Sequence, residues 1–264
     1  MKKLELCVLI TTMNKNIKRV KEELLPQLTD CNVVISHQIT KTDIHPETEP
    51  LGKNVFYTPI YNSGASTNRN NALKYAKGDI CIFCDDDLNY IPNFKEIIIK
   101  GYMENPKADV ITFRAIKPEG TFHDKLNKKF KHNFKTILSV ITWMISFKNE
   151  SVVSKDIKFD ENFGFSRYLG CEENIFLKDC LDNNLNILHL PEPIVIHPEE
   201  STGNSWTEHV IYSKGAAFRR MYGNVCGALL CLIFCILKYG EYKKKLSFMK
   251  HLKLILKGFF DFRG

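Results

Sequence analysis

The sequence predicts an α/β fold in which a mostly parallel sheet is flanked by helices. Short apolar runs rich in β-forming residues alternate with segments of helical periodicity, which is the pattern of strands joined by helical crossovers. The 264 residues, 44% hydrophobic and 25% charged, are enough for one large α/β domain and an appendage. The last sixty or so residues lose the alternation and show helical periodicity only.

The first half of the chain contains the clearest alternation. Apolar runs of strand length predict strands at residues 4–11, 32–39, 55–58, 80–84 and 108–115. Apolar residues three or four positions apart predict helices at residues 17–27, 67–77 and 93–105. Gly78 follows the second helix and Pro92 precedes the third, and these residue types are typical of helix ends and starts.

The second half is less regular. Residues 117–136 are polar, basic and weakly periodic, so we expect a mobile loop or a short inserted subdomain. The pattern then predicts a strand at 139–147, a helix at 171–184 and a strand at 187–190, and an all-helical region from His209 onward. Because proline removes a ladder donor, we expect the cluster of Pro191, Pro193 and Pro198 to end regular structure and lead the chain out of the sheet.

The positive charge is concentrated at the end of the chain. The net charge is +7, and residues 238–264 contain eight Lys or Arg and two Asp or Glu, giving +6. The other residues therefore have 29 basic and 28 acidic side chains, giving +1. A nucleic-acid enzyme usually spreads basic residues over its working face, so nucleic acid is not an expected partner. A basic tail is better suited to an anionic lipid surface.

Three carboxylates follow the buried strand predicted at 80–84: Asp85, Asp86 and Asp87. Ligands of open α/β sheets bind at the carboxyl ends of strands. Adjacent carboxylates repel one another, and a divalent cation such as Mn²⁺ or Mg²⁺ removes that repulsion. The pattern therefore indicates a metal site that also takes substrate phosphates. The alternative is a solvated acidic turn that caps the following helix.

Four segments, in this order, resemble the family 2 glycosyltransferases with a GT-A fold, and the resemblance covers roughly residues 4–200. The first has a glycine and an Arg-Asn pair that opens a helix, and the second is the strand that ends in the DXD motif. The third is the F-D-E-x-F segment before the acceptor site, and the fourth is an acidic pair at a helix start. In this chain they read NSGASTNRNNAL (62–73), GDICIFCDDD (78–87), KFDENFG (158–164) and GCEENIF (170–176).

The resemblance implies a nucleotide site built from two parts of the chain. Thr11, Thr12 and Asn14 would line the base pocket after the first strand, and Arg69 would support the nucleotide. The carboxylates Asp85 and Asp86 would hold the ribose or the metal-bound diphosphate. Two positions that contact the base in relatives depart from the family pattern, namely Ser36-His37-Gln38 and Thr11-Thr12-Met13-Asn14. These departures leave the donor base open.

The resemblance also implies metal and catalytic residues. Asp87 would be the direct metal ligand, with Asp85 as a second carboxylate, and His197 would contact the metal or the diphosphate. Glu173 and Glu172 occupy the catalytic acidic motif, and Glu173 stands where the family usually has the aspartate base. Taken without the resemblance, two acidic residues at a helix start are also explained by the helix dipole.

The activity implied is an inverting sugar transfer from a nucleotide diphosphate donor, expected to be a UDP-sugar, to a hydroxyl of a glycan or lipid-linked acceptor. The sugar would be a hexose or an N-acetylhexosamine. A divalent cation would stabilise the leaving diphosphate, and a carboxylate would take the acceptor proton. One alternative is a nucleotidyltransferase, but the Gly-rich, Lys/Arg-bearing loop expected after the first strand is absent from residues 11–14. The other is a non-catalytic, membrane-docked nucleotide-sugar-binding module.

The organisation expected is a catalytic domain at 1–205, with a nucleotide-sugar-binding half at 1–115 and an acceptor-binding half at 116–205, and a helical region at 206–264. Residues 225–237 are an uninterrupted apolar run of 13 residues, shorter than the ~20 needed to span a bilayer. On a helical wheel the residues that follow it separate into a basic side and an apolar side. The basic side has Lys243, Lys250 and Lys257, and the apolar side has Met249, Leu252, Leu256 and Phe259.

This tail predicts a helix that lies on a membrane. The alternatives are a core helix packed on the catalytic domain and an oligomer contact, so a homo-oligomer stays open. The apolar run at the start of the chain is interrupted by Glu5 and is a poor signal peptide. We therefore expect a cytoplasmic protein attached peripherally to the inner face of the cell membrane.

Overall fold

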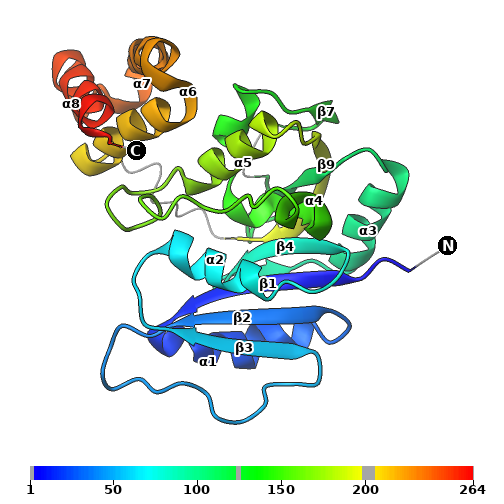
Figure 1. Ribbon diagram of the computed structural model, residues 1–264. Helices are drawn as coiled ribbons and strands as arrows, with labels where there is room; N and C mark the ends of the chain where they lie inside the picture. Colours follow the sequence, from blue (N-terminus) through cyan, green and yellow to red (C-terminus); the bar gives the residue numbers. More distant parts are fainter. Residues whose placement is uncertain (1–2, 123–125, 198–205, 264) are drawn as a thin grey trace.

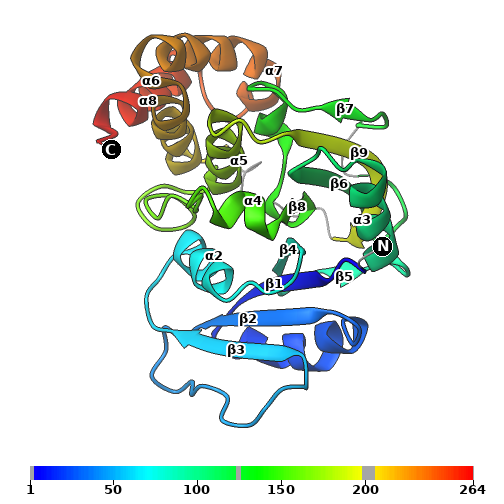
Figure 2. The same ribbon diagram turned by 45° about the vertical axis from the view of Figure 1, so that its right-hand side comes forward.

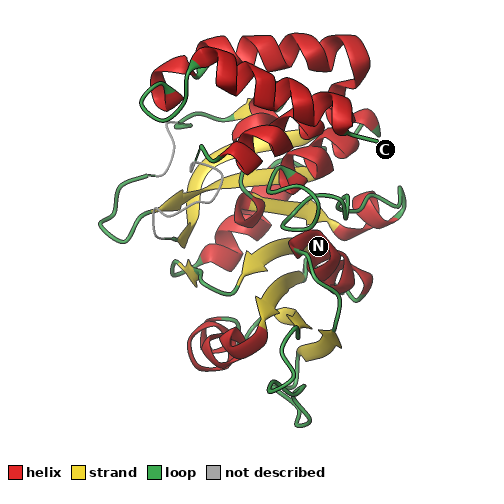
Figure 3. Cartoon of the chain, turned by 90° about the vertical axis from the view of Figure 1, so that its left-hand side faces the viewer, coloured by secondary structure: helices red, strands yellow, loops and turns green. Residues whose placement is uncertain are grey.

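A computed structural model describes residues 3–122, 126–197 and 206–263. The described strands form one curled sheet with the order β3-β2-β1-β4-β8-β6-β9-β5, and β7 pairs with β9 beside this path. Helices cover the sheet, and the C-terminal helices gather at the end of the molecule opposite β3 (Figures 1 and 3). The predicted α/β class with a mostly parallel sheet is confirmed.

The N-terminal half is the parallel part of the sheet. Each of its four strands pairs in parallel with its neighbours in this half. The strands are β1 (Leu6–Met13), β2 (Asn32–Gln38), β3 (Val55–Ile60) and β4 (Ile80–Asp85). Two helical segments connect them: α2 (Ala65–Lys74), and a stretch at 14–27 that contains α1 (Ile17–Arg19), a π-helical turn (Val20–Leu24) and 3₁₀ turns (Asn14–Asn16, Leu25–Gln27). The strands and helices predicted here are confirmed, although α2 ends before Gly78.

The second half mixes strand directions. Its elements are β5 (Asn89–Tyr90), α3 (Phe94–Glu104), β6 (Val110–Ile116), β7 (Phe130–Lys131), β8 (Ile145–Lys148), α4 (Asn149–Val153), α5 (Glu172–Asp182) and β9 (Ile187–Ile196). β8 is antiparallel to both β4 and β6, whereas β6 and β9 are parallel. β8 therefore joins the parallel N-terminal block to the β6–β9 pair. The region predicted as a loop or insertion contains the short strand β7, and residues 123–125 lie outside the described part.

The strand predicted at 139–147 is largely wrong. Two 3₁₀ turns, Thr136–Ser139 and Thr142–Met144, overlap this stretch, and the strand begins only at Ile145. The Asn174 amide donates to the carbonyl oxygens of Ile137 (2.9 Å) and Val140 (3.3 Å). These carbonyls are therefore used by a side chain from α5 and do not join a strand ladder.

The predicted break at the proline cluster is also wrong. β9 runs through Pro191 and Pro193 and ends at Ile196. Its pairing with β6 shifts register on both sides of Arg114, and Arg114 lies opposite Pro193. An irregular ladder tolerates residues that lack an N–H donor, so the prolines sit where the pairing is already interrupted. Pro198 lies outside the described residues.

The C-terminal helices are α6 (Glu208–Leu237), α7 (Tyr239–Tyr242) and α8 (Phe248–Asp261). Gly223 interrupts α6 with φ 70° and ψ −160°. This residue bends the helix sharply and brings the two sides of the bend together, so that a Cβ on Gly227 would lie 2.6 Å from the carbonyl oxygen of Phe218. We call residues 208–222 the first arm of α6 and residues 224–237 the second arm (Figure 2).

The C-terminal helices have a hydrophobic core of their own. It includes Ile211, Phe218 and Phe259 from these helices, and Phe163, Tyr168 and Ile175 from the loop before α5 and from α5. Gly215 and Gly258 bring α6 and α8 into backbone contact, since a Cβ on either would lie within 2 Å of a carbonyl oxygen of the other helix. The predicted helical character is confirmed. The apolar side of α8, predicted to lie on a membrane, is instead packed on the protein at Leu252, Leu256 and Phe259, and Met249 is its exposed member.

Gly258→Ala should destabilise the protein by about 1–3 kcal/mol, because its methyl group would overlap the Tyr212 carbonyl and force α6 and α8 apart. Gly240→Ala is the matched control, because no heavy atom lies within 4 Å of a Cβ at that position in α7. Urea unfolding of both variants would measure the difference. Equal free energies of unfolding would contradict the close contact between the two helices.

Candidate active site

The candidate site lies at the carboxyl ends of β1 and β4, which are neighbours in the sheet (Figure 2). The register places Thr11 opposite Asp85, so the residues after both strands leave the sheet at the same edge. Asp85 is the last residue of β4, and Asp86 and Asp87 follow in a turn. The three carboxylates predicted to form the site are therefore at a sheet edge beside the first strand, where α/β folds bind ligands.

Arg69 connects two parts of the predicted site. It lies in α2 and is buried, and its guanidinium donates to Asp85 (Nη2 to Oδ1, 3.0 Å) and to Glu172 (Nη1 to Oε1, 2.8 Å). Burial opposes the charge of Arg69, but the carboxylates of Asp85 and Glu172 outweigh burial and raise the pKa of the guanidinium. The ring of Phe159 lies under the same group at 5.6 Å. Arg69 stays charged and ties the end of β4 to the start of α5.

Asp86 is held by the end of β1 and the turn that follows it. Its carboxylate accepts hydrogen bonds from the Thr12 hydroxyl (2.6 Å) and the Asn16 amide (3.4 Å). Burial raises the pKa of Asp86, and these two hydrogen bonds oppose that rise. The Asn68 amide of α2 in turn donates to the Thr12 carbonyl (3.1 Å). Thr12 and Asp86 therefore fix the end of β1 relative to the turn after β4.

Asp87 faces His197, which follows β9. The Nε2 atom of His197 lies 3.4 Å from Oδ2 of Asp87, and this hydrogen bond lowers the pKa of Asp87 against the opposing effect of burial. The ring of Trp143 stacks on His197 at 5.2 Å between centroids and so fixes the imidazole plane. The other oxygen of Asp87, Oδ1, is buried and has no hydrogen-bond partner among the described residues.

These groups fit a divalent cation. A buried carboxylate oxygen without a partner, beside an imidazole, is an incomplete coordination shell of the kind that Mn²⁺ accepts. The described part of the chain has no group of three or more His, Cys, Asp or Glu side chains arranged around one point. Asp87 and His197 would therefore supply only part of the shell, and diphosphate oxygens and water would complete it.

Glu172 and Glu173 differ in their surroundings although they are adjacent. Both lie in the first turn of α5, after Cys171 in the left-handed conformation (φ 67°). Glu172 is buried and bound to Arg69, whereas no other described residue gives the half-buried carboxylate of Glu173 a hydrogen bond or ion pair. Burial, and then the neighbouring charge of Glu172, raise the pKa of Glu173 to about 8. A carboxylate with such a pKa is a strong base near neutral pH.

The segment before α5 is attached to α2. Asn70 acts as a two-point clamp on Phe159, because its amide donates to the Phe159 carbonyl and accepts from the Phe159 N–H, both at 2.9 Å. The N–H of Ala65 donates to the carbonyl of Gly164 (2.7 Å). Gly164 has φ 77°, and a Cβ there would lie 2.8 Å from the Ser66 hydroxyl, so only glycine suits this contact. These bonds place the F-D-E-x-F segment beside the start of α2.

The residues predicted for the base pocket lie at the ends of β1 and β2. The side chain of Asn14 is occupied by Thr40, since its amide donates to the Thr40 hydroxyl and its oxygen accepts the Thr40 N–H, both at 2.9 Å. The carbonyl of Asn14 contacts Nε2 of buried His37 (2.8 Å). Asn14 and His37 therefore shape the loop between these strands, while the hydroxyls of Thr11 and Thr12 point to Asp85 and Asp86.

Several site residues were not predicted from the sequence. Arg19 donates to the Asp87 carbonyl (3.1 Å), and Asn16, Asn68, Asn70 and Trp143 hold or orient predicted residues. The one sequence signal that could have found two of them, Asn68 and Asn70, is the polar run 68–70 in α2, where all three side chains are buried. Buried polar side chains in a helix need partners.

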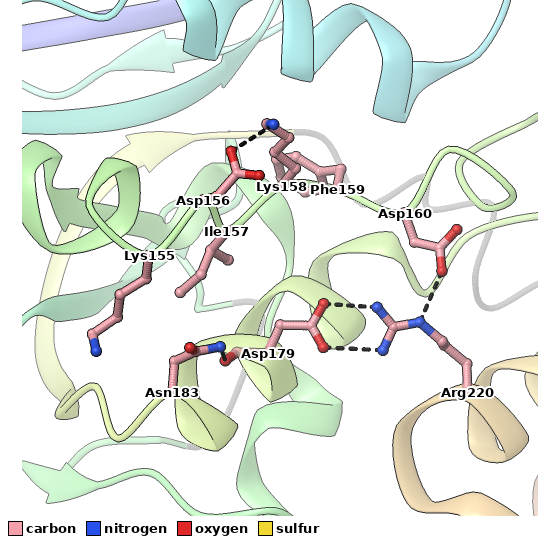
Figure 4. Close-up of a pocket in the computed structure, with 9 residues that line it drawn as sticks. All are labelled: Lys155, Asp156, Ile157, Lys158, Phe159, Asp160, Asp179, Asn183 and Arg220. Carbon is pink, nitrogen blue, oxygen red and sulfur yellow. Dashed lines mark hydrogen bonds and ion pairs between the residues drawn. The ribbon is translucent and has the colours of Figure 1, made fainter. Parts of the chain in front are cut away.

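A pocket of about 350 Å³ lies beside the F-D-E-x-F segment (Figure 4). Arg220 of the first arm of α6 lines it and forms a fork with Asp179 of α5 (Nη1 3.0 Å, Nη2 2.9 Å). The Nε atom of Arg220 donates to Asp160 (2.9 Å). None of the residues proposed above for catalysis or metal binding lines this pocket. Its ion pairs fasten the first arm to the catalytic part of the chain.

Comparison with solved structures shows the same fold in other proteins. The fold is similar to that of residues 1–349 of TarS from S. aureus, with a TM-score of 0.63 and 14% identity over 97% of this chain and 81% of that one. The same TarS fragment in complex with UDP-GlcNAc matches with a TM-score of 0.63 and 15% identity, over 97% and 80% of the two chains. A search of curated proteins found no match.

A third similar structure is the mannosyltransferase PcManGT from Pyrobaculum calidifontis, in complex with GDP-Man and Mn²⁺. Its TM-score is 0.60 and its identity 13%, over 99% of this chain and 88% of that one. At these identities the likeness shows the fold, which is GT-A. The sequence match is independent, because the model of glycosyl transferase family 2 matches residues 8–168. The chain therefore belongs to glycosyltransferase family 2.

Proposed function

We propose that the protein is an inverting, metal-dependent glycosyltransferase. It moves a hexose or N-acetylhexosamine from a nucleotide diphosphate donor to a hydroxyl of a glycan or lipid-linked acceptor in cell-surface polysaccharide biosynthesis. The observation that carries the proposal is the arrangement around Arg69, which joins the carboxylates at the end of β4 to the helix start that presents Glu173. The residues proposed to bind the donor and the residue proposed to act on the acceptor are thereby held in a fixed relation to each other.

Glu173 acts as the base in this proposal. Its carboxylate takes the proton from the acceptor hydroxyl while that oxygen attacks the anomeric carbon from the side opposite the leaving diphosphate. One displacement of this kind inverts the anomeric centre. Glu172 is a positioning residue, because its carboxylate is bound to Arg69 and only Glu173 of the pair lacks a partner in the described structure.

The leaving diphosphate is placed by the other half of the site. Asp87 and His197 would hold Mn²⁺ or Mg²⁺, which supplies charge stabilisation to the departing phosphate oxygens. Asp85 is engaged by Arg69 and Thr11 and so orients the turn. In this proposal it would face the ribose side of the donor. The fold neighbours were crystallised with UDP, UDP-GlcNAc and GDP-Man, and we propose a UDP-sugar for this chain.

Asp87→Ala should raise the Kd for the donor at least about tenfold when Mn²⁺ is present, because the cation loses its carboxylate ligand. The measurement is calorimetric titration with a panel of UDP- and GDP-sugars, with Mn²⁺, with Mg²⁺ and with chelator. Asp30→Ala is the control, since Asp30 is exposed and lies in the turn before β2, away from the carboxyl ends of the strands.

With chelator, the wild type and Asp87→Ala should bind the donor equally weakly. Nucleotide release measured on the same panel identifies the sugar and the base. If Asp87→Ala and the wild type have the same Kd in Mn²⁺, the metal site is misplaced. If the wild type binds a donor and releases no nucleotide with any acceptor tested, the chain is a binding module and the proposed transfer is wrong.

A further inference from the structure

The second arm of α6 has an apolar face with nothing of the described chain packed on it. Residues 224–237 contain no charged side chain, and those on the outer face follow the spacing of one helix side. We call this face the outer stripe, and its exposed members are Val225, Cys226, Leu229, Leu232, Ile233, Ile236 and Leu237. Val225 is 72% and Leu237 75% exposed.

The opposite side of the same arm is already used. Cys231 and Cys235 are fully buried, and Cys235 contacts the His251 ring of α8 (3.1 Å). Gly227 is packed against Phe259. The second arm is therefore apolar on all sides, with one side in a protein core and the other exposed. A contiguous exposed apolar face of this kind marks an interaction site on a folded protein.

Basic side chains follow the outer stripe in the sequence. Exposed lysines occur in the turn after α7 and along α8, where the exposed apolar residues Met249 and Phe260 lie among them. These lysines are Lys243, Lys244, Lys245, Lys253 and Lys257. An apolar face followed by a basic segment is complementary to an anionic lipid surface, where acyl chains take the apolar side chains and headgroups attract the lysines.

We propose that the outer stripe inserts into one leaflet of an anionic bilayer and that the chain does not span it there. By length and composition alone, α6 qualifies as a helix able to cross a membrane. The break at Gly223, however, leaves a second arm of 14 residues, from 224 to 237, whose length at 1.5 Å per residue is about 21 Å. The hydrocarbon core is about 30 Å thick, so the arm is too short to cross it.

A second copy of this chain is a less suitable occupant. A symmetric dimer formed through the outer stripe would present the same patch on both subunits. The basic residues that follow the stripe would then lie close to their own symmetry mates and repel one another. An anionic membrane, by contrast, attracts the same basic residues.

The first arm of α6 holds the inserted arm in a fixed relation to the active site. Arg220 binds Asp179 in α5, the helix whose first turn contains Glu173. Phe163 and Tyr168 of the proposed acceptor side pack with the C-terminal helices. Docking would thus place the acceptor side near the lipid surface. Only this last consequence depends on the proposed function, because lipid binding itself requires no turnover.

The test is co-sedimentation of the full chain with phosphatidylcholine vesicles, with and without phosphatidylglycerol. The wild type should bind the anionic vesicles at least about tenfold more tightly than the neutral ones. The double variant Leu232→Gln with Ile236→Gln should lose at least about tenfold in affinity for anionic vesicles. Its matched control is Met103→Gln with Val153→Gln, which changes two similarly exposed apolar residues (52% and 56%) in α3 and α4.

A second pair of variants tests the charges. Replacing Lys243, Lys244 and Lys257 by Gln should abolish the preference for anionic vesicles, whereas replacing the exposed Lys41, Lys53 and Lys107 should leave it unchanged. All substituted side chains are exposed, so thermal unfolding midpoints should match the wild type. Nucleotide release with a water-soluble acceptor should also be unchanged, which separates a failure of docking from a failure of the proposed transfer.

The depth to which the second arm inserts is measured at Cys226, the one exposed cysteine of the nine in the chain. A fluorescent label there should be quenched by lipids brominated near the headgroup and much less by lipids brominated at the chain end. Strong quenching at the chain end would overturn insertion into one leaflet. Unchanged vesicle binding by the Leu232/Ile236 variant, with a shift from dimer to monomer in sedimentation velocity, would assign the outer stripe to a second copy and overturn the proposal.

Discussion

Glu173→Gln should lower the rate of sugar transfer by about 10²–10⁴-fold, the usual contribution of a positioned base, while the Kd for the donor stays within about twofold. The amide keeps the size of the side chain and cannot take the acceptor proton. Glu104→Gln is the control, since it makes the same change at an exposed position in α3. Single-turnover transfer and donor titration measure the two quantities separately. Loss of donor binding in Glu173→Gln, or unaltered transfer, would contradict the assignment.

The pH profile adds an independent readout. The base acts as a carboxylate, and its pKa is about 8, so the wild-type rate should rise tenfold per pH unit below 8 and level off above it. The residual rate of Glu173→Gln should lack this rise. A wild-type profile that is flat between pH 6 and 9, with the donor saturating, would show that another group takes the proton.

The raised pKa of Glu173 also makes this residue destabilising at high pH. Its pKa is higher in the folded than in the unfolded chain, so between about 4.5 and 8 the folded state binds more protons. Stability therefore falls as the pH rises through this window, because the buried carboxylate must ionise. Glu173→Gln should accordingly unfold at a higher temperature than the wild type at pH 9. Its loss of activity would then have no explanation in misfolding.

Arg69→Met should destabilise the protein by about 3–5 kcal/mol, which is the second large effect expected. Removing the guanidinium leaves the carboxylate of Glu172, which is buried, without its counter-charge and weakens the hold on Asp85. Sugar transfer should fall as well, because the end of β4 and the start of α5 are no longer tied. Urea unfolding measures the stability, and the slope of the transition shows whether the folded state stays compact.

The double variant Arg69→Met with Glu172→Gln is the control for this explanation. It has no unpaired carboxylate at position 172, so it should recover a substantial part of the lost stability and none of the lost transfer. The free energy of unfolding of Arg69→Lys should lie between those of the wild type and Arg69→Met. One ammonium group cannot donate to both carboxylates in the same planar geometry. If the double variant is as unstable as Arg69→Met, the loss comes from packing and the charge explanation is wrong.

The sequence predicted the sheet and its ligand-binding edge because both depend on local patterns. The strand at 80–84 is apolar throughout, and the following carboxylates are adjacent in sequence. Pairing between Thr11 and Asp85 then follows from the parallel order of β1 and β4. These are short-range signals, and the folded chain retains them.

The connection through Arg69 could not be predicted, because Arg69 and Glu172 are 103 positions apart. No local pattern tells which buried arginine meets which carboxylate. The 3₁₀ turns at 136–144 were missed for a related reason: the side chain of Asn174 decides where those carbonyls bond. The prolines of β9 led to a wrong prediction because their effect depends on how β9 pairs with β6. That pairing is also a non-local feature.

The C-terminal region shows a third reason why parts of the structure could not be predicted from the sequence. Helical periodicity is unchanged across Gly223, so the pattern gives no sign of a bend there. The bend decides which apolar residues of α6 enter the core and which form the outer stripe. Membrane association remains a proposal, but the residues that would make the contact are now defined.

The fork between Arg220 and the two aspartates has a practical consequence for preparing a soluble enzyme. Cutting the chain before α6 would remove Arg220, whose guanidinium pairs with both Asp160 and Asp179. It would also expose Phe163, Tyr168 and Ile175 to solvent. The shortened product would aggregate, because the catalytic part has no replacement for the surface it loses. Detergent-free purification is better sought by making the outward side of the second arm hydrophilic, one residue at a time, with every helix left in place.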